Sequence, residues 1–140
     1  MNIKVRSIPS SGLSFESSVM PREIGLTEDF INPEQPVTVN GLFERVGEFV
    51  LARVEMTCGI ENHCARCLER LSRRETFKYS LEFELAPGQE YIDVGERLRE
   101  EMILGHVPRT LCREDCKGIC PGCGAELNTE QCECKEKNKE

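Results

Sequence analysis

The sequence predicts an α+β fold, mainly an antiparallel β-sheet or small barrel with one packed helix, plus a C-terminal zinc-knuckle mini-domain. Three observations support this prediction. Segments between Pro36 and Pro87 alternate apolar and polar residues, a later segment has helical spacing, and six of the nine cysteines fall between Cys112 and Cys134. A chain of 140 residues suffices for one ordinary domain, so a second folded unit needs a means of stabilisation other than an apolar core.

Only short strands are expected in the first 36 residues. This segment holds four of the seven prolines, which interrupt long regular elements. Apolar residues nevertheless alternate around Ile3 and Val5 and again over 13–19. Two short strands are therefore predicted there.

The central segment predicts a hairpin followed by a further strand. Apolar positions alternate from Val37 to Phe43, Gly47 offers a turn, and the run from Val50 to Cys58 places its apolar residues on one face. Alternation is also regular over 77–85 and ends at Pro87-Gly88. One buried face and one solvated face are typical of antiparallel sheets.

One helix is predicted near residues 94–105. Asp93 stands three residues before Glu96, which is a capping arrangement, and Val94, Leu98 and Met102 form an apolar stripe at helical spacing. The predicted organisation is thus a β-rich domain over 1–110, a cysteine cluster over 111–134 and a disordered charged tail over 135–140.

The C-terminal cysteines predict a structural zinc site. The segment has too few apolar residues to offset its backbone entropy, and a zinc ion held by four thiolates contributes folding free energy directly. Four thiolates leave no open coordination position, so the ion has no hydrolytic role. Iron–sulfur ligation also uses four thiolates, but a knuckle rich in Pro and Gly favours zinc.

The ligand set is anchored by the Cys120-Pro-Gly-Cys123-Gly knuckle. Its proline and glycines suit a tight turn in which two thiolates grip one ion. The predicted ligands are Cys116, Cys120, Cys123 and Cys132, with Cys112 and Cys134 as alternates. Cys132 and Cys134 point to opposite sides if extended, so one of the two is expected to bind. A six-thiolate site with two zinc ions remains an alternative.

A second thiol pair, Cys64 and Cys67, follows the predicted hairpin. Three interpretations stay open: a redox dithiol, half of a second zinc site, or an ordinary pair of thiols at a sheet corner. A second zinc site would have to recruit Cys58, His63 or cysteines of the tail.

Charge and composition restrict the function. The net charge is −7, so the chain as a whole is repelled by phosphate backbones. The candidate contact surface for RNA or a partner protein is the local basic group Arg66, Arg70, Arg73, Arg74 and Lys78. With two histidines and no phosphate-binding loop or nucleophile elbow, no catalytic residue is assigned and the protein is expected not to be an enzyme.

No membrane and no small-molecule substrate are expected. The sequence has no apolar run long enough to span a bilayer, and its first residues lack the apolar core of a secretory signal. The expected location is the cytoplasm, where disulfides do not persist and dense cysteines indicate metal binding.

Several motifs together resemble the bacterial YceD family of large ribosomal RNA subunit accumulation proteins. They are Cys64-Ala-Arg-Cys-Leu-Glu69, the helix beginning Val94-Gly95, and Asp115-Cys-Lys-Gly-Ile-Cys-Pro-Gly-Cys-Gly-Ala-Glu-Leu-Asn128. The resemblance covers about residues 37–134 and places the chain in the cysteine-rich branch.

The resemblance implies a non-enzymatic factor in ribosome biogenesis that supports processing or accumulation of 23S ribosomal RNA. Its implied partner is ribosomal RNA or a large-subunit assembly protein. The alternatives are a thiol- or zinc-responsive regulator using Cys64 and Cys67, and a protein–protein adaptor module.

Overall fold

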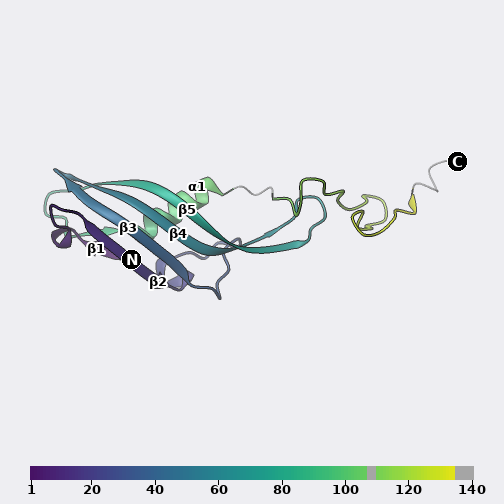
Figure 1. Cartoon of the computed structure of the whole chain (residues 1–140), viewed down its shortest axis with the longest axis horizontal. Helices are drawn as coiled ribbons and strands as arrows, with labels where there is room; N and C mark the ends of the chain where they lie inside the picture. The colour runs from purple at the N-terminus through teal and green to yellow at the C-terminus, as the bar shows by residue number, and fades with distance from the viewer. Residues whose placement is uncertain (107–109, 135–140) are drawn as a thin grey trace. The chain divides into compact units, whose positions relative to one another are not determined.

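Antiparallel strands and one helix make up most of the regular structure, as the sequence predicts. The computed structural model describes residues 1–106 and 110–134 (Figure 1). The elements in chain order are β1 (Asn2–Lys4), the 3-10 helix η1 (Val5–Ser7), β2 (Leu13–Val19), the 3-10 helix η2 (Pro21–Ile24), β3 (Val37–Val46), β4 (Phe49–His63), β5 (Arg70–Glu84), β6 (Tyr91–Asp93) and α1 (Val94–Gly105).

The main sheet has four strands in the order β2-β3-β4-β5, visible side by side in Figure 1. Strands β2 and β3 pair antiparallel with Leu13 opposite Phe43, and β3 pairs antiparallel with β4. The turn between β3 and β4 places Val46 opposite Phe49, and Gly47 there has a φ of 59°, a conformation that glycine adopts without steric cost. The predicted hairpin is confirmed.

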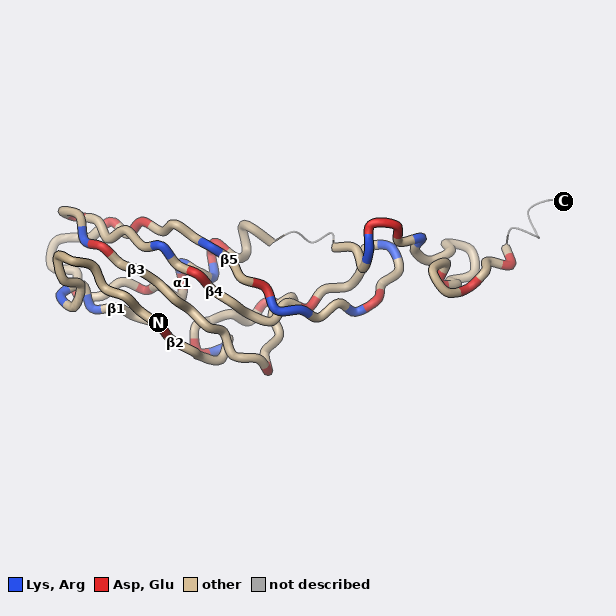
Figure 2. Tube along the Cα trace, in the orientation of Figure 1, with Lys and Arg blue, Asp and Glu red and all other residues tan. Residues whose placement is uncertain are grey.

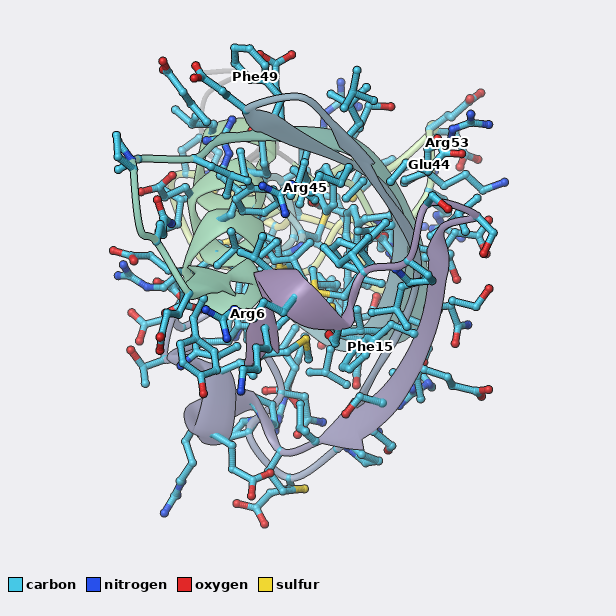
Figure 3. All side chains as sticks on the ribbon, turned by 90° about the vertical axis from the view of Figure 1, so that its left-hand side faces the viewer. Arg6, Phe15, Glu44, Arg45, Phe49 and Arg53 are labelled. Carbon is cyan, nitrogen blue, oxygen red and sulfur yellow. The ribbon has the colours of Figure 1, made fainter. Side chains whose placement is uncertain are left out.

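The inner face of this sheet forms the hydrophobic core because its apolar residues recur every second position. In β3 and β4 the buried side chains are Val37, Val39, Phe43, Val50, Ala52, Val54, Met56 and Cys58. In β5, Leu81 is buried, whereas Phe77, Tyr79 and Phe83 are only partly buried. Figure 3 shows the core side chains filling the concave side of the sheet, with Phe49 and Arg53 pointing outward.

Helix α1 packs on the core through the predicted stripe. Val94, Leu98 and Met102 are buried, and the helix ends at Gly105. At its start the Glu96 N–H donates a hydrogen bond of 3.0 Å to Asp93 Oδ1, which satisfies one of the unpaired amides of the first turn. Both the cap and the buried face follow the sequence.

A second, two-stranded sheet was not predicted. Strand β6 pairs antiparallel with β1, with Ile3 opposite Ile92, and both of these residues are buried. A strand of three residues is too short to show an alternating pattern, so the sequence offers no signal for β6. This sheet places Met1 beside the start of α1, where the Val94 N–H donates to the Met1 carbonyl oxygen at 2.9 Å.

The chain divides into two compact units. The first contains Met1–Ile60 and Arg73–His106, and the second contains Glu61–Ser72 and Val107–Glu140. The sequence assigned only 111–134 to the cysteine cluster, whereas the structure adds the tip of the β4–β5 hairpin to it. The predicted disordered tail, 135–140, lies outside the described residues. No described helix combines the length and apolarity that crossing a membrane requires.

Candidate metal centres

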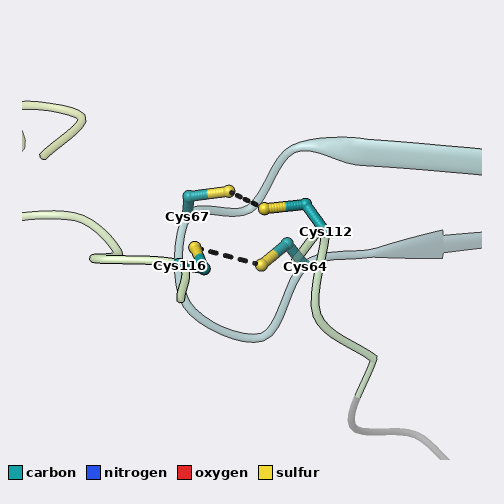
Figure 4. A group of neighbouring side chains, drawn as sticks. All are labelled: Cys64, Cys67, Cys112 and Cys116. Atoms are coloured by element: carbon teal, nitrogen blue, oxygen red, sulfur yellow. Dashed lines mark hydrogen bonds between the residues drawn. The ribbon is translucent and has the colours of Figure 1, made fainter. Parts of the chain in front are cut away.

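Four cysteines from two distant stretches of the chain meet in the first cluster, which consists of Cys64, Cys67, Cys112 and Cys116. Their sulfur atoms all lie within 4.8 Å of one another. The Cys64 and Cys116 sulfurs are 3.6 Å apart, and so are those of Cys67 and Cys112 (Figure 4). Three of the four side chains are buried, beside Leu71, Leu111 and Ile119.

A tight turn at the tip of the β4–β5 hairpin supplies two of these sulfurs. The Leu68 N–H donates to the Cys64 carbonyl oxygen at 2.9 Å, and the Cys64 N–H donates to the Glu69 carbonyl oxygen at 2.8 Å. Leu68 has a φ of 63° and is the single non-glycine residue with positive φ among those described. This turn, residues 64–68, is called the hairpin knuckle below.

Backbone contacts bring the tail to the hairpin knuckle. The Ala65 N–H donates to the Thr110 carbonyl oxygen at 2.8 Å, and the Ile119 N–H donates to the Arg66 carbonyl oxygen at 3.1 Å. The Arg66 guanidinium in turn donates from Nη1 to the Cys116 carbonyl oxygen at 3.0 Å. The tail thus passes the hairpin with Cys112 and Cys116 facing the first two sulfurs.

The second cluster lies entirely in the tail and contains Cys120, Cys123, Cys132 and Cys134. The sulfurs of Cys123 and Cys132 are 3.7 Å apart, and those of Cys120 and Cys132 are 3.1 Å apart. Its turn over 120–124, called the tail knuckle below, repeats the backbone of the hairpin knuckle. The Gly124 N–H donates to the Cys120 carbonyl oxygen at 2.9 Å, and the φ of Gly124 is 75°.

The spacing of the sulfurs fits a shared tetrahedral ion. Zinc–sulfur bonds of about 2.3 Å in a tetrahedron place the sulfurs about 3.8 Å apart, whereas a disulfide requires about 2.05 Å. Three of the four sulfur–sulfur distances given above, 3.6–3.7 Å, are close to the tetrahedral value, and the Cys120–Cys132 distance of 3.1 Å is shorter. All nine cysteines are free thiols. Each cluster therefore has the donor set and spacing to hold one metal ion.

Hydrogen bonds favour the thiolate form, in which cysteine binds metals, at the first cysteine of each knuckle. The Cys67 backbone N–H is the main reason that the pKa of Cys64 is lowered to about 6. The pKa of Cys120 is also lowered to about 6, first by the side chain of Cys132 and then by the backbone N–H groups of Cys123 and Gly122. The Gly122 N–H lies 3.4 Å from Cys120 Sγ.

The predicted ligand set is regrouped by the structure. Cys120, Cys123 and Cys132 do lie together, but their fourth neighbour is Cys134, and Cys116 lies in the first cluster. Cys132 and Cys134 reach the same cluster because the chain turns between them, with the Cys134 N–H donating to Cys132 Sγ at 3.3 Å. The expectation that only one of this pair faces the site assumed an extended chain.

Of the three interpretations of Cys64 and Cys67, the geometry favours half of a metal site completed by the tail. Neither Cys58 nor His63 belongs to a described cluster. Cys58 is buried in the β-sheet core, and this burial raises the pKa of its thiol to about 11. The sequence left open that cysteines of the tail complete this site, but it could not select Cys112 and Cys116, because Cys67 and Cys112 are 45 positions apart.

The predicted basic residues are divided between the two units and already have polar partners. Arg70 pairs with Glu61 at 2.7 Å, Lys78 pairs with Glu55 at 3.1 Å, and Arg73 pairs with Glu75. Arg74 donates to the Pro36 carbonyl oxygen, and Arg66 is held by Cys116 as described. Figure 2 shows basic and acidic residues interleaved along the β4–β5 hairpin, so the positive charge is locally compensated.

Comparison with known proteins identifies the family. A family described as "Large ribosomal RNA subunit accumulation protein YceD" matches residues 52–140, a segment that contains both cysteine clusters. The chain belongs to the YceD family. The resemblance noted from the cysteine motifs is thereby confirmed.

Two curated plant proteins are similar to part of this YceD chain. Both are named large ribosomal RNA subunit accumulation protein YCED homolog 1, chloroplastic. The one from Zea mays is 40% identical over 48 residues, which cover 34% of this chain and 16% of the relative. The one from Arabidopsis thaliana is 33% identical over 54 residues, which cover 39% of this chain and 17% of the relative. The matched segments thus span about a sixth of each relative's length. No solved structure matches significantly.

Proposed function

We propose that this YceD protein is a non-enzymatic, zinc-stabilised factor in ribosome biogenesis that supports processing or accumulation of the 23S ribosomal RNA. Membership of the YceD family carries the proposal, because the family is named for accumulation of the large ribosomal RNA subunit. Both similar plant proteins are also named as large ribosomal RNA subunit accumulation proteins.

The proposed metal is Zn²⁺, one ion in each cluster. All-thiolate tetrahedral sites are typical of structural zinc, and the sulfur spacing in both clusters suits that geometry. Four thiolates fill the coordination of each ion, so zinc here orders the chain and performs no chemistry on a substrate. The second unit needs this contribution, since its small apolar cluster is built around cysteines.

We place the protein in the reducing cytoplasm of a bacterial cell. Eight free thiols grouped in two clusters suited to a metal are typical of a reducing compartment, where disulfides do not persist. A candidate partner is ribosomal RNA or a large-subunit assembly protein, contacted through the basic residues between Arg66 and Lys78. Among them the side chains of Arg70 and Lys78 are the more accessible, 67% and 77% exposed despite their ion pairs.

An adaptor that binds an assembly protein is the second candidate. The net charge of −7 and the acidic partners of the basic residues disfavour close approach to bare phosphate. A basic protein would meet no such repulsion. Co-purification with ribosomal particles that persists after RNase treatment supports the adaptor, and loss on RNase treatment supports direct RNA contact.

Complementation tests the proposed function. In cells depleted of their own YceD protein, the wild-type chain is expected to restore the ratio of mature large-subunit to small-subunit ribosomal RNA. A variant with Arg70→Glu and Lys78→Glu is expected to restore it less well. The matched control is Arg97→Glu, which reverses the charge of a residue on α1 that is likewise held in an ion pair, with Glu100. Full restoration by the hairpin variant would exclude these side chains as a contact, and no restoration by wild type would contradict the proposed function.

A further inference from the structure

We propose that the two cysteine clusters bind their metal ions cooperatively, and that Asn128 is the positioning residue that couples them. The inference deepens the proposed function and rests on its zinc ions. It derives from the contacts of one half-buried side chain that belongs to the loop of the second cluster and reaches a sulfur of the first.

The Asn128 side chain connects the two clusters by two hydrogen bonds. Its Oδ1 accepts from the Lys117 N–H at 2.9 Å, and its Nδ2 donates to Cys116 Sγ at 3.3 Å. The first contact fixes the orientation of the amide, because a flipped group would direct its NH2 donors at a backbone N–H. The conformation of the loop therefore directs the Asn128 Nδ2 donor at Cys116 Sγ.

A donor at this sulfur stabilises the metal-bound thiolate. Hydrogen bonds to charged acceptors are stronger than those between neutral groups, and partners of metal ligands set both ligand orientation and affinity. The pKa of Cys116 is lowered, with the Asn128 side chain as the largest cause, which agrees in direction. Asn128 thus acts on the first cluster without being one of its ligands.

The position of Asn128 in turn depends on the second cluster. The residue lies between Cys123 and Cys132, so an ion held by those two sulfurs closes the loop around it. The same loop is anchored by the Leu127 N–H, which donates to the Gly118 carbonyl oxygen at 2.9 Å, and by the Ala125 carbonyl oxygen, which accepts from the Cys120 N–H at 2.9 Å. Ordering of the tail knuckle therefore fixes the loop in the conformation in which Asn128 contacts Cys116 Sγ.

A short connecting segment transmits the effect in both directions. Residues 116–120 begin with a ligand of the first cluster and end with a ligand of the second. In the middle, Gly118 has a φ of 78°, and a Cβ there would stand 3.2 Å from the Arg66 carbonyl oxygen of the hairpin knuckle. A metal ion in either cluster restricts this connecting segment, so that an ion binding to the other cluster loses less conformational entropy. Each ion therefore raises the affinity of the other cluster by the same factor.

The test reads the two sites separately by ¹¹³Cd NMR of the full chain, with Cd²⁺ as the probe and a chelator as competitor. Cys123→Ser with Cys132→Ser removes the second site, and we expect the first site to lose affinity roughly tenfold. Asn128→Ala is expected to cause a similar loss at the first site while both resonances remain. Combining the three substitutions should add little further loss, since they break the same link.

Two further variants sharpen the test. Gln131→Ala changes an exposed residue of the same loop and is expected to leave both affinities unchanged. Asn128→Asp keeps an acceptor for the Lys117 N–H but replaces the donor by a carboxylate beside the thiolate, so the first site should weaken at least as much as with alanine. The aspartate variant thereby separates loss of the donor from collapse of the loop.

The outcomes distinguish the coupling from the metal sites themselves. If wild type binds two ions but both Asn128 variants behave like Gln131→Ala, the coupling is wrong and the zinc proposal stands. The same conclusion follows if removal of the second site leaves the first-site affinity intact. If wild type binds no ion at either cluster, the zinc part of the proposed function fails, and the coupling fails with it.

Discussion

Leu68 and Gly124 occupy equivalent positions in the two knuckles. Each has positive φ, 63° for Leu68 and 75° for Gly124, and each donates its N–H at 2.9 Å to the carbonyl oxygen of the first cysteine of its knuckle. Glycine adopts this conformation freely, whereas an L-residue pays about 1–2 kcal/mol. The hairpin knuckle therefore carries backbone strain that the tail knuckle avoids.

Relieving that strain is expected to stabilise the metal-loaded protein. Leu68 is 63% exposed, so Leu68→Gly loses little packing and should gain up to about 1 kcal/mol, while Gly124→Ala should cost about 1 kcal/mol. The effect of each substitution is measured as a shift in the temperature at which the protein releases zinc, followed with a chromogenic chelator. Leu68→Ala is the control, because it removes the side chain but keeps the strain. Equal effects of alanine and glycine at position 68 would contradict the explanation.

Metal content should be two zinc ions per chain, as measured by native mass spectrometry. Cys67→Ser with Cys112→Ser is expected to leave one ion, held by the second cluster. Cys123→Ser with Cys134→Ser is likewise expected to leave one ion, held by the first cluster. A single ion in wild type that is lost in either double variant would favour one site that mixes ligands from both clusters.

Alkylation should distinguish the eight cysteines of the two clusters from Cys58. Chelation of the metal exposes the cluster cysteines, so iodoacetamide is expected to modify eight positions under native conditions. Cys58 is fully buried in the β-sheet core and should react only after denaturant is added. Mass spectrometry counts the adducts. Modification of all nine thiols at one rate would show that chelation also opens the β-sheet core.

Cys58 also predicts a loss of stability at alkaline pH. Its pKa in the folded chain is raised to about 11 from the ordinary thiol value of 9.0, because burial penalises the thiolate. Below pH 9 the thiol is neutral in both states. Between pH 9 and about 11 the unfolded chain ionises first, so folding loses free energy as pH rises. Urea unfolding of wild type against Cys58→Ala across this range isolates the effect. Parallel pH profiles would contradict it.

Phe43 should be among the most costly core positions to truncate. Its side chain is fully buried and makes an edge-on contact with Phe15, with ring centroids 6.3 Å apart. Phe43→Ala is expected to destabilise the β-sheet unit by about 3–5 kcal/mol in urea unfolding followed by circular dichroism. Phe49→Ala, on the outward face of the same hairpin, is the matched control and should cost clearly less. Equal losses would contradict the assignment of the two faces.

Local patterns predicted the elements whose causes are local. The alternation in β3 and β4, the turn at Gly47 and the Asp93 cap each depend on residues a few positions apart. The grouping of the cysteines depends instead on a loop closure between positions 67 and 112, which no local period encodes. Spacing identified the tail knuckle, but it could not show that Cys116 faces the hairpin. The positive φ of Leu68 was also hidden, because leucine gives no signal for it.

The separation of 52 positions between Cys64 and Cys116 has a consequence for biosynthesis. At typical translation rates of about 5–20 residues per second, the two hairpin cysteines are synthesised roughly 2–10 s before their tail partners. During that interval the hairpin pair has only two of the four cysteines of its cluster. The first cluster can therefore be completed only late in synthesis, after residue 116 has been added to the chain.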